Sequence, residues 1–488
     1  MKSASAIVIG SGIAGLAAAV RLQVKGYRVT VFEANAYPGG KLSQFEQDGF
    51  LFDAGPSLFT MPRLVDELFL LAGKNPKDYF RYKRLDTLCH YFFADGTRLN
   101  AAADEEQFAD AAALATGVDK TKVLRHLRKS RYIYNTTADL FISRSLHKAS
   151  SYLRWDTFVS FLKLPFLNVM DTMNGTNEKG LGNDKMVQLF NRFATYNGSD
   201  PYQAPGILNI IPHLEHHLGA YYPEGGMYSI TDSVYRLAQE LGVQFRFETP
   251  VTQIHIRNNR VTGVEAGGQT HAADVVACNM DVVLAYRKLM PTQPQPETIL
   301  KQERSSSALI FYWGIGHSFP QLGLHNIFFS KDYRAEFAAI FQQNTVCDDP
   351  TVYINITSKE DPSHAPEGCE NWFVMVNVPA DKGQDWDALI ARVRQQVIQK
   401  LSEQLCVDLA PLIRTEDLLD PRSIAAKTQS FQGALYGTSS NKRMAAFFRH
   451  PNFSSHAKGL YFCGGSVHPG GGIPLALSSA KIVDSLID

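Results

Sequence analysis

Residues 7–15 of this chain read IVIGSGIAG, and this stretch decides the fold. The apolar run before Gly10 predicts a strand and the run after Gly12 predicts a helix, so the glycines fall in the turn between them. In such a turn Gly10 permits the tight bend, Gly12 lets a pyrophosphate approach the backbone, and Gly15 lets the helix pack closely on the strand. The stretch therefore predicts the start of a dinucleotide-binding unit.

The residues after this turn complete the unit. Ile13 and Ala14 open the helix expected at 13–25, whose N-terminal amides and dipole favour a phosphate. A second strand, expected at 28–32, leads to Glu33, at the distance where a carboxylate accepts the hydroxyls of a ribose. The order strand (6–9), turn, helix, strand and acid predicts a Rossmann-like fold of the α/β class.

Further glycine segments distinguish an extended flavin from a nicotinamide cofactor. Residues 39–41 would follow the adenosine ribose and phosphate, with Lys41 as a point charge, and residues 55–57 would approach a ring system. The stretch 464–472 opens the last helix, whose dipole can stabilise negative charge on a reduced flavin. The pattern predicts FAD. The other residues expected to contact it are Ala34, Gly39, Gly40, Leu42, Gly55, Pro56, Ser57, Gly464, Gly465, Gly472, Ile473 and Pro474.

Composition sets the broad class. The chain has 488 residues, 45% of them hydrophobic, and a formal net charge of zero. These values indicate a soluble protein of two domains, or of one domain with large insertions, with no global attraction for nucleic acid. Six cysteines lack metal-ligand spacing and are expected to be reduced thiols in the cytoplasm. The run HLEHH at 213–217 matches neither zincin pattern, so no metal site is predicted.

Residues 121–170 carry a local excess of positive charge. Nine Lys or Arg and two Asp give 9 − 2 = +7, and aromatic and leucine residues lie among them. This mixture favours a basic amphipathic helical region at an anionic lipid surface. The alternative is a solvated helical face over an ordinary core.

The chain resembles the bacterial phytoene-desaturase-type carotenoid desaturases over nearly its whole length. Val467 stands where that family usually has Thr or Ala, and Lys41 where it usually has Arg. These differences should not abolish flavin binding, but each could alter its affinity. The segments that carry the resemblance are the N-terminal turn, 39–41, 52–57, 358–368, 433–437, 447–452 and the C-terminal stretch 459–474.

The resemblance implies a fold and a domain plan. The fold is a discontinuous FAD-binding domain of the glutathione-reductase/amine-oxidase type, with an inserted α+β substrate domain. The strand that begins at Val251 commonly meets the adenine in this fold. The expected boundaries are 1–75, 221–290 and 451–488 for the FAD-binding domain, 76–120, 171–220 and 291–450 for the substrate domain, and 121–170 for a membrane-docking region.

The resemblance also implies the reaction. Two hydrogens leave adjacent carbons of a C40 carotenoid, one to the flavin and one as a proton, and a membrane quinone or O2 takes the electrons. Residues 192–205 resemble the subgroup that desaturates hydroxylated or methoxylated acyclic ends at carbons 3 and 4. Such a substrate predicts a peripheral location at the inner face of the cell membrane. His468, beside the flavin loop, is the candidate to orient the ring or accept a proton; a structural hydrogen bond is the alternative.

Several functions stay open at this point. A phytoene desaturase proper, a carotenoid isomerase or a ketolase would belong to the same family, and a flavin amine oxidase or protoporphyrinogen-type oxidase would share the fold. A non-catalytic lipid carrier of this fold would lack an intact flavin site. Strands predicted at 308–313, 327–329, 352–356 and 373–378 either line a substrate tunnel or form only sheet core. The sequence does not indicate an oligomeric state.

Overall fold

A five-stranded parallel sheet forms the centre of one half of the molecule. The computed structural model describes residues 4–148, 167–168, 170–442 and 448–487. The strands lie in the order β10-β2-β1-β14-β20 and are short and apolar, because a parallel sheet is covered on both faces. They are β1 (Ser5–Ile9), β2 (Arg28–Phe32), β10 (Gln244–Arg246), β14 (Val275–Cys278) and β20 (Leu460–Phe462).

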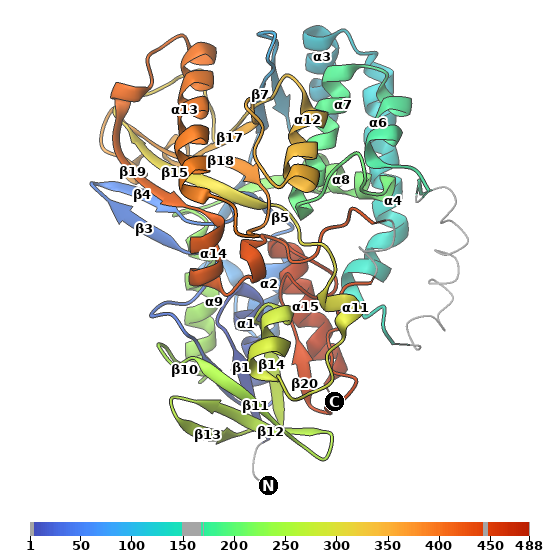
Figure 1. Cartoon of the computed structure of the whole chain (residues 1–488), viewed down its shortest axis with the longest axis vertical. Helices are drawn as coiled ribbons and strands as arrows, with labels where there is room; N and C mark the ends of the chain where they lie inside the picture. The colour runs from blue at the N-terminus through green and yellow to red at the C-terminus, as the bar shows by residue number, and fades with distance from the viewer. Residues whose placement is uncertain (1–3, 149–166, 169, 443–447, 488) are drawn as a thin grey trace.

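Helices cover one face of this sheet and a small antiparallel sheet covers the other (Figure 1). The elements predicted at 6–9, 13–25 and 28–32 are confirmed to within one residue. The helices are α1 (Ile13–Val24), α2 (Arg63–Leu71), α9 (Tyr228–Glu240) and α15 (Ile473–Leu486), and the covering strands are β11 (Val251–Arg257), β12 (Arg260–Ala266) and β13 (Gln269–Ala272).

A seven-stranded mixed sheet forms the other half of the molecule. Its order is β19-β15-β18-β17-β16-β7-β8, and the β16–β7 pair is parallel. Side chains alternate across it, so Phe311 and Trp313 pack against α13 (Trp386–Leu405), while Ile310 and Tyr312 face the opposite side. The strands are β7 (Thr87–Phe92), β8 (Arg98–Ala102), β15 (Ser307–Ile315), β16 (His325–Phe328), β17 (Val352–Ile356), β18 (Glu370–Val378) and β19 (Ile413–Leu419).

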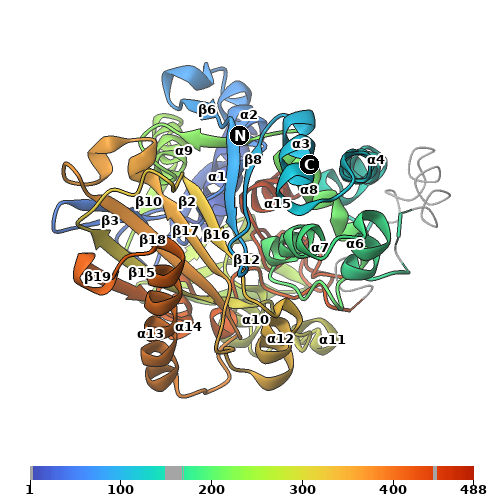
Figure 2. The ribbon, with the colours of Figure 1, turned by 90° about the horizontal axis from the view of Figure 1, so that it is seen from above.

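A group of helices packs beside the second sheet around its own apolar core (Figure 2). They are α3 (Glu105–Thr116), α4 (Lys120–Ser143), α6 (Met173–Leu181), α7 (Asp184–Asn191), η4 (Arg192–Asn197), η5 (Gly206–Ile210) and α8 (Ile211–His216). The described structure also contains two smaller sheets. The first is β3 (Gln44–Gln47) with β4 (Phe50–Asp53), and its Phe50 and Phe52 pack with Ile310 and Tyr312 of the second sheet. The other is β5 (Phe59–Thr60), β9 (Ala220–Pro223) and β6 (Tyr82–Arg84), and its Phe59 lies in the core of the first half.

Part of the basic region predicted at 121–170 falls in α4. Val123, Leu127 and Ile133 are buried against the protein, while Arg125 and Arg128 are exposed, so the described part has a solvated basic face over an ordinary core. The rest of the predicted region, residues 149–166 and 169, lies outside the described residues. Within the parts of the chain that the structure covers, no helix is long and apolar enough to cross a membrane.

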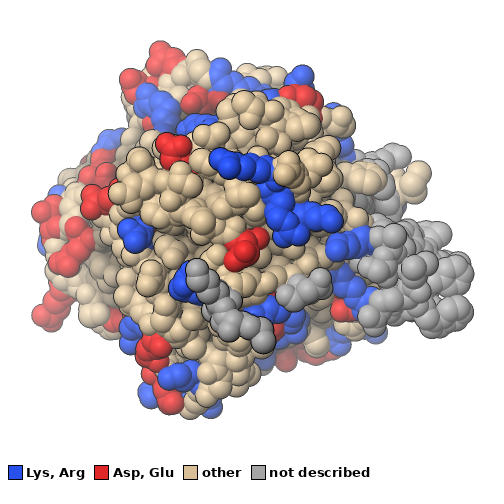
Figure 3. Space-filling view, turned by 90° about the horizontal axis from the view of Figure 1, so that it is seen from below, with Lys and Arg blue, Asp and Glu red and all other residues tan. Residues whose placement is uncertain are grey.

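Charge is unevenly distributed over the lower face of the molecule. Figure 3 shows acidic side chains gathered toward one edge of this face and basic side chains to the other side of its centre. The zero net charge of the chain thus conceals local regions of one sign.

Candidate functional site

One cavity of about 1530 Å³ lies between the two main sheets and extends along the carboxyl ends of the parallel strands. It brings the N-terminal turn together with the closing glycine segment. Of the residues predicted from the sequence, only Gly15 is outside its lining. The lining includes Gly10, Gly12, Ile13, Ala14, Glu33, Ala34, Gly39, Gly40, Lys41, Leu42, Gly55, Pro56, Ser57, Val251, Gly464, Gly465, His468, Gly472, Ile473 and Pro474.

Gly15 lies behind the cavity because it serves packing. A Cβ at this position would lie 2.0 Å from the carbonyl oxygen of Gly10, so the helix approaches the strand as closely as only glycine allows. Gly10 itself has a φ of +89° and donates its amide to the carbonyl oxygen of Phe32 at 2.8 Å. The turn is thereby fixed between β1 and β2.

Asn279, at the end of β14, lies between the two glycine segments. A Cβ on Gly12 would lie 2.8 Å from one end of its side-chain amide, and a Cβ on Gly464 would lie 2.6 Å from the other end. Asn279 also lines the cavity. No sequence motif surrounds Asn279, and its position depends on the pairing of β14 with β1 and β20.

The carboxylate of Glu33 is held in a fixed orientation at the rim of the first sheet. Its Oε2 accepts the amide of Ser11 at 2.7 Å and the hydroxyl of Ser11 at 2.8 Å, and its Oε1 accepts the amide of Asn35 at 2.9 Å. Glu33 is 6% exposed. Oε1 has one protein partner, so it retains the capacity to accept a ribose hydroxyl.

The segment 39–42 is anchored on both sides of the cavity. The amide of Gly39 donates to the carbonyl oxygen of Ser11 at 2.9 Å. The ammonium of Lys41 donates to the carbonyl oxygens of Ala434 at 3.2 Å and Leu435 at 2.8 Å. Burial lowers the pKa of Lys41 to about 8, although Asp281 opposes this effect. Lys41 thus joins two distant segments, and its action on a phosphate stays a prediction.

Gly55 can be no other residue at its position. A Cβ there would lie 1.7 Å from the carbonyl oxygen of Lys41. The neighbouring Ser57 places its hydroxyl 2.8 Å from the hydroxyl of Tyr353, so the loop contacts the second sheet. The segment 54–58 therefore lines the cavity and connects the Lys41 segment with the second sheet.

Two helices that begin at the cavity, α1 and α15, start after a glycine. Gly12 precedes α1 and Gly472 precedes α15, and a glycine brings no capping side chain of its own. By contrast, α3 and α13 begin after aspartates, which accept amide hydrogens of the first turn. Glycine at both starts, with no bulk between the first-turn amides and the cavity, fits an anionic ligand lying across the two helices.

His468 lies in the cavity wall and is 1% exposed. Its Nε2 bonds with the carbonyl oxygen of Arg144 at 2.8 Å, which assigns the ring hydrogen to Nε2. Its Nδ1 is buried and has no hydrogen-bond partner within the described chain. Burial lowers the pKa of His468 to about 4, so the ring is neutral. The hydrogen bond to Arg144 also joins the end of α4 to the closing segment.

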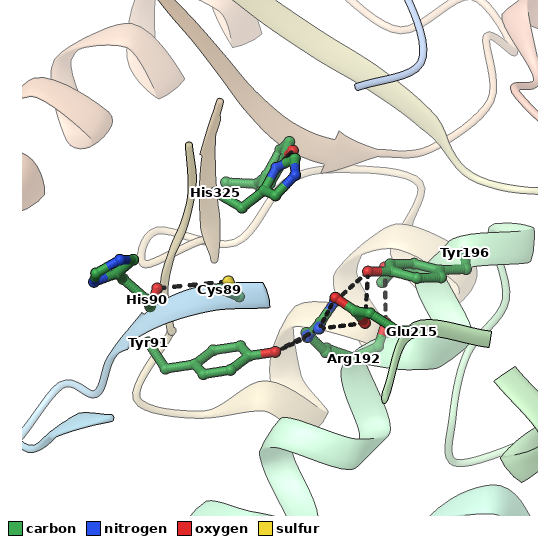
Figure 4. Close-up of polar contacts among 9 residues, drawn as sticks. Cys89, His90, Tyr91, Arg192, Tyr196, Glu215 and His325 are labelled. Carbon is green, nitrogen blue, oxygen red and sulfur yellow. Dashed lines mark hydrogen bonds and ion pairs between the residues drawn. The ribbon is translucent and has the colours of Figure 1, made fainter. Parts of the chain in front are cut away.

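A buried charged group lies at another part of the same cavity (Figure 4). Arg192 is 4% exposed and Glu215 is 2% exposed, and Arg192 Nη2 lies 3.0 Å from Glu215 Oε2. The guanidinium also donates to the hydroxyls of Tyr91 and Tyr196, and Tyr196 donates to Glu215 at 3.2 Å. Burial opposes the charge on Arg192, but Glu215 with these hydroxyls outweighs it and raises the pKa of the guanidinium.

The sequence contained these residues without showing their role. Arg192 begins the segment 192–205, and Glu215 is the acid of the HLEHH run. In the structure Glu215 pairs with Arg192 rather than with the neighbouring histidines. The pairing joins η4 to α8, and no local pattern predicts it.

Comparisons with known proteins identify the family of this chain. The family model described as flavin containing amine oxidoreductase matches residues 13–483. The 1-hydroxycarotenoid 3,4-desaturase of Flavobacterium sp. (strain P99-3) is 53% identical over 482 residues, which are 99% of this chain and 98% of that protein. The 4,4'-diapolycopene oxygenase of Methylomonas sp is 35% identical over 98% of this chain and 96% of its own length.

Solved structures show the same fold. A triple mutant of putrescine oxidase superposes with a TM-score of 0.65 at 14% identity, covering 99% of this chain and 98% of its own. The likeness confirms the fold that was predicted, and the family match confirms the prediction of FAD as the cofactor. The resemblance to carotenoid desaturases is likewise confirmed. The chain belongs to the flavin-containing amine oxidoreductase family.

Proposed function

We propose that the protein is an FAD-dependent carotenoid desaturase that introduces a C=C double bond at carbons 3 and 4 of a 1-hydroxylated acyclic or γ-carotene-type end. The observation that carries this proposal is the 53% identity, over 99% of the chain, to a protein named for this reaction. A relative at 35% identity is named an oxygenase, so oxygenation of a carotenoid end is the second candidate.

The walls of the cavity suit a long apolar polyene. The second sheet contributes Ile310, Phe373 and Met375, and the helical region contributes Ile207 and Leu208. A polyene in this space buries apolar surface and excludes water from the reacting carbons. Alternate side chains of the second sheet's strands face α13 or the cavity, and those that face the cavity, such as Ile310 and Phe373, would line the predicted substrate tunnel.

We further propose that the predicted contact residues hold FAD. Glu33 would accept from a ribose hydroxyl, the first turn of α1 would bind the pyrophosphate, and the turn before α15 would lie at the flavin ring. The glycine positions fit, since a Cβ at Gly12 would lie 2.8 Å from the side-chain amide of Asn279 and would fill the space beside the turn. When bound, FAD accepts two electrons and one of the two hydrogens that leave the substrate.

The other hydrogen leaves as a proton, and His468 Nδ1 is the acceptor in our proposal. The atom is buried and has no partner within the described chain, while Nε2 is fixed by the Arg144 carbonyl. A pKa of about 4 makes this a weak base. A weak base suffices because the developing positive charge is spread over conjugated double bonds.

Electrons and substrate both point to a membrane setting. We propose that a membrane quinone or O2 takes the electrons, and that the basic region 121–170 docks the protein at the inner face of the cell membrane. The domain division given above belongs to the same proposal. The membrane docking is supported by the charge of +7 (9 − 2) in residues 121–170 and by the apolar character of the substrate class.

Conversion of defined carotenoids tests the function. Flavin-loaded protein in liposomes is given a 1-hydroxylated acyclic carotenoid and a quinone, and the product is examined by chromatography and absorption. We expect a product with one more conjugated double bond and absorption at longer wavelength. Gly12→Val is the negative control, since it should lack flavin. A product enriched in oxygen would support the oxygenase alternative instead.

A further inference from the structure

His325 occupies a buried position in the wall of the proposed substrate cavity. It lies on β16, is 4% exposed, and lines the cavity together with Arg192 and Glu215 (Figure 4). Its Nε2 is buried and has no hydrogen-bond partner in the part of the chain that the structure describes. Buried polar atoms without partners are unfavourable, so this atom requires an explanation.

The contacts of the other ring nitrogen define the tautomer. The side-chain nitrogen of Asn355 lies 3.2 Å from His325 Nδ1 and also donates to the carbonyl oxygen of Leu324 at 3.1 Å. The Leu324 carbonyl can only accept, which identifies the Asn355 atom as the amide nitrogen. His325 Nδ1 therefore accepts a hydrogen, and the ring hydrogen lies on Nε2. The hydroxyl of Tyr353, 2.8 Å from Nδ1, is in position to donate as well.

His325 is a neutral donor rather than a cation. Burial, together with the nearby positive charge of Arg192, lowers its pKa to about 3. At neutral pH this cavity-lining side chain thus carries one N–H group without net charge, and that group has no partner within the described chain. The matching ligand atom is an uncharged oxygen acceptor, such as a hydroxyl or ether oxygen.

His325 lies close to the loop 55–57, which is predicted to approach the flavin ring. Tyr353, which contacts His325, also lies 2.8 Å from the hydroxyl of Ser57, a residue predicted to approach the flavin ring. One tyrosine therefore separates His325 from that loop. Carbons 3 and 4 are two and three bonds from carbon 1, so an oxygen on carbon 1 held near this loop would bring those carbons to the flavin.

From these observations, and resting on the proposed function, we infer that His325 Nε2 donates a hydrogen bond to the oxygen on carbon 1 of the substrate and so determines its specificity. The lining of the cavity is apolar at Ile310 and Ile327 and polar at Tyr353 and at the Arg192–Glu215 group. A substrate without the oxygen would leave the N–H of His325 unpaired, and such sites discriminate strongly against the analogue that lacks the polar group.

Two variants of His325 test the assignment. His325→Phe keeps a ring but removes the donor, whereas the side-chain amide of His325→Gln can reach the place of Nε2 with an N–H. Dissociation constants and kcat/KM are measured for a 1-hydroxylated carotenoid and for the same polyene without oxygen. We expect His325→Phe to weaken the hydroxylated ligand at least about tenfold, with unchanged FAD content and no effect on the other polyene. His325→Gln should retain most of the preference.

A change of substrate gives an independent test with the unaltered protein. A 1-methoxy carotenoid keeps the acceptor oxygen but has no hydroxyl hydrogen, so it should bind within a few-fold of the 1-hydroxy form. Equal losses for both polyenes in His325→Phe, or equal affinity of the unaltered protein for both, would overturn the assignment. Binding that discriminates without any conversion would keep the assignment and refute the proposed reaction.

Discussion

The thiol of Cys463 donates to the carbonyl oxygen of Ala14 across 3.8 Å, so the residue before the closing glycine turn touches the first helix of the chain. Asn279 lies at the same place, between Gly12 and Gly464. This contact brings two segments separated by more than four hundred residues to one end of the cavity. The arrangement fits our proposal that both segments bind one dinucleotide, because each of them brings a helix start to the same end of the cavity.

Cys463 is not expected to bind flavin covalently. Its side chain is 1% exposed, its thiol is directed at the Ala14 carbonyl, and burial raises the pKa of the thiol. A thiol of this kind is a poor nucleophile. Acid precipitation should therefore release all of the yellow colour into the supernatant, and Cys463→Ser should retain flavin. Colour that stays with the pellet in the original protein and is lost in Cys463→Ser would contradict this expectation.

Glu33→Ala should weaken FAD retention. The substitution removes an acceptor that Ser11 and Asn35 hold in place, and a hydrogen bond to a charged group contributes about 1.5–3 kcal/mol, or about ten- to hundredfold in the dissociation constant. The ratio of flavin to protein after gel filtration measures the effect. Glu106→Ala, on α3, is the matched control and should keep full flavin. Equal occupancy in both variants would rule out a ribose contact for Glu33.

The stability of the protein should depend on pH through His216. Burial lowers the pKa of this histidine to about 3, far below its ordinary value of 6.5. The unfolded state therefore binds the proton first, and the histidine reduces stability as pH falls below 6.5. His216→Gln removes this effect. Relative to the unaltered protein, the variant should gain about 1.4 kcal/mol per pH unit between pH 6 and pH 4.

Urea unfolding at several pH values measures this difference, with pH 8 as the reference for the loss of packing. A difference between the two proteins that stays constant from pH 8 to pH 4 would show that the histidine is charged or solvated in the folded state.

Neutralising the basic face of α4 should weaken lipid binding. Lys122, Arg125, Arg128 and Lys129 lie on the first turns of this helix, and each basic residue near an anionic surface contributes about 1 kcal/mol. The fourfold Gln variant should lose at least about tenfold in co-sedimentation with anionic liposomes. Neutralising Arg257, Arg260, Lys301 and Lys382 instead is the control for total charge. Identical sedimentation of both variants would remove the docking role of α4.

The sequence predicted the parts of the fold that local signals define. The unit around Gly10, Gly12 and Gly15 combines an apolar strand, a turn and a helix within a few residues, so its bounds and its place in the cavity followed directly. The closing segment was found in the same way. In both segments the spacing of the glycines indicates a tight turn, because glycine adopts backbone conformations that other residues disfavour.

Side-chain pairs between distant elements could not be predicted. The ammonium of Lys41 donates to the Leu435 carbonyl, 394 residues away, and no local pattern indicates this contact. The partnership of Arg192 with Glu215, and that of His325 with Tyr353, arises only after η4, α8, β16 and β17 have assembled around the cavity. The segment 386–405, a long helix that covers the second sheet, was not anticipated among the predicted strands of that region.

The mass of the product tests the central claim most directly. Flavin-loaded protein is incubated with a 1-hydroxylated acyclic carotenoid and a quinone. The product is separated by chromatography and its molecular mass is measured by mass spectrometry. The account predicts a product about two mass units lighter than the substrate, with one mole of quinone reduced per mole of product. A product of unchanged mass, or one that has gained oxygen, would contradict it.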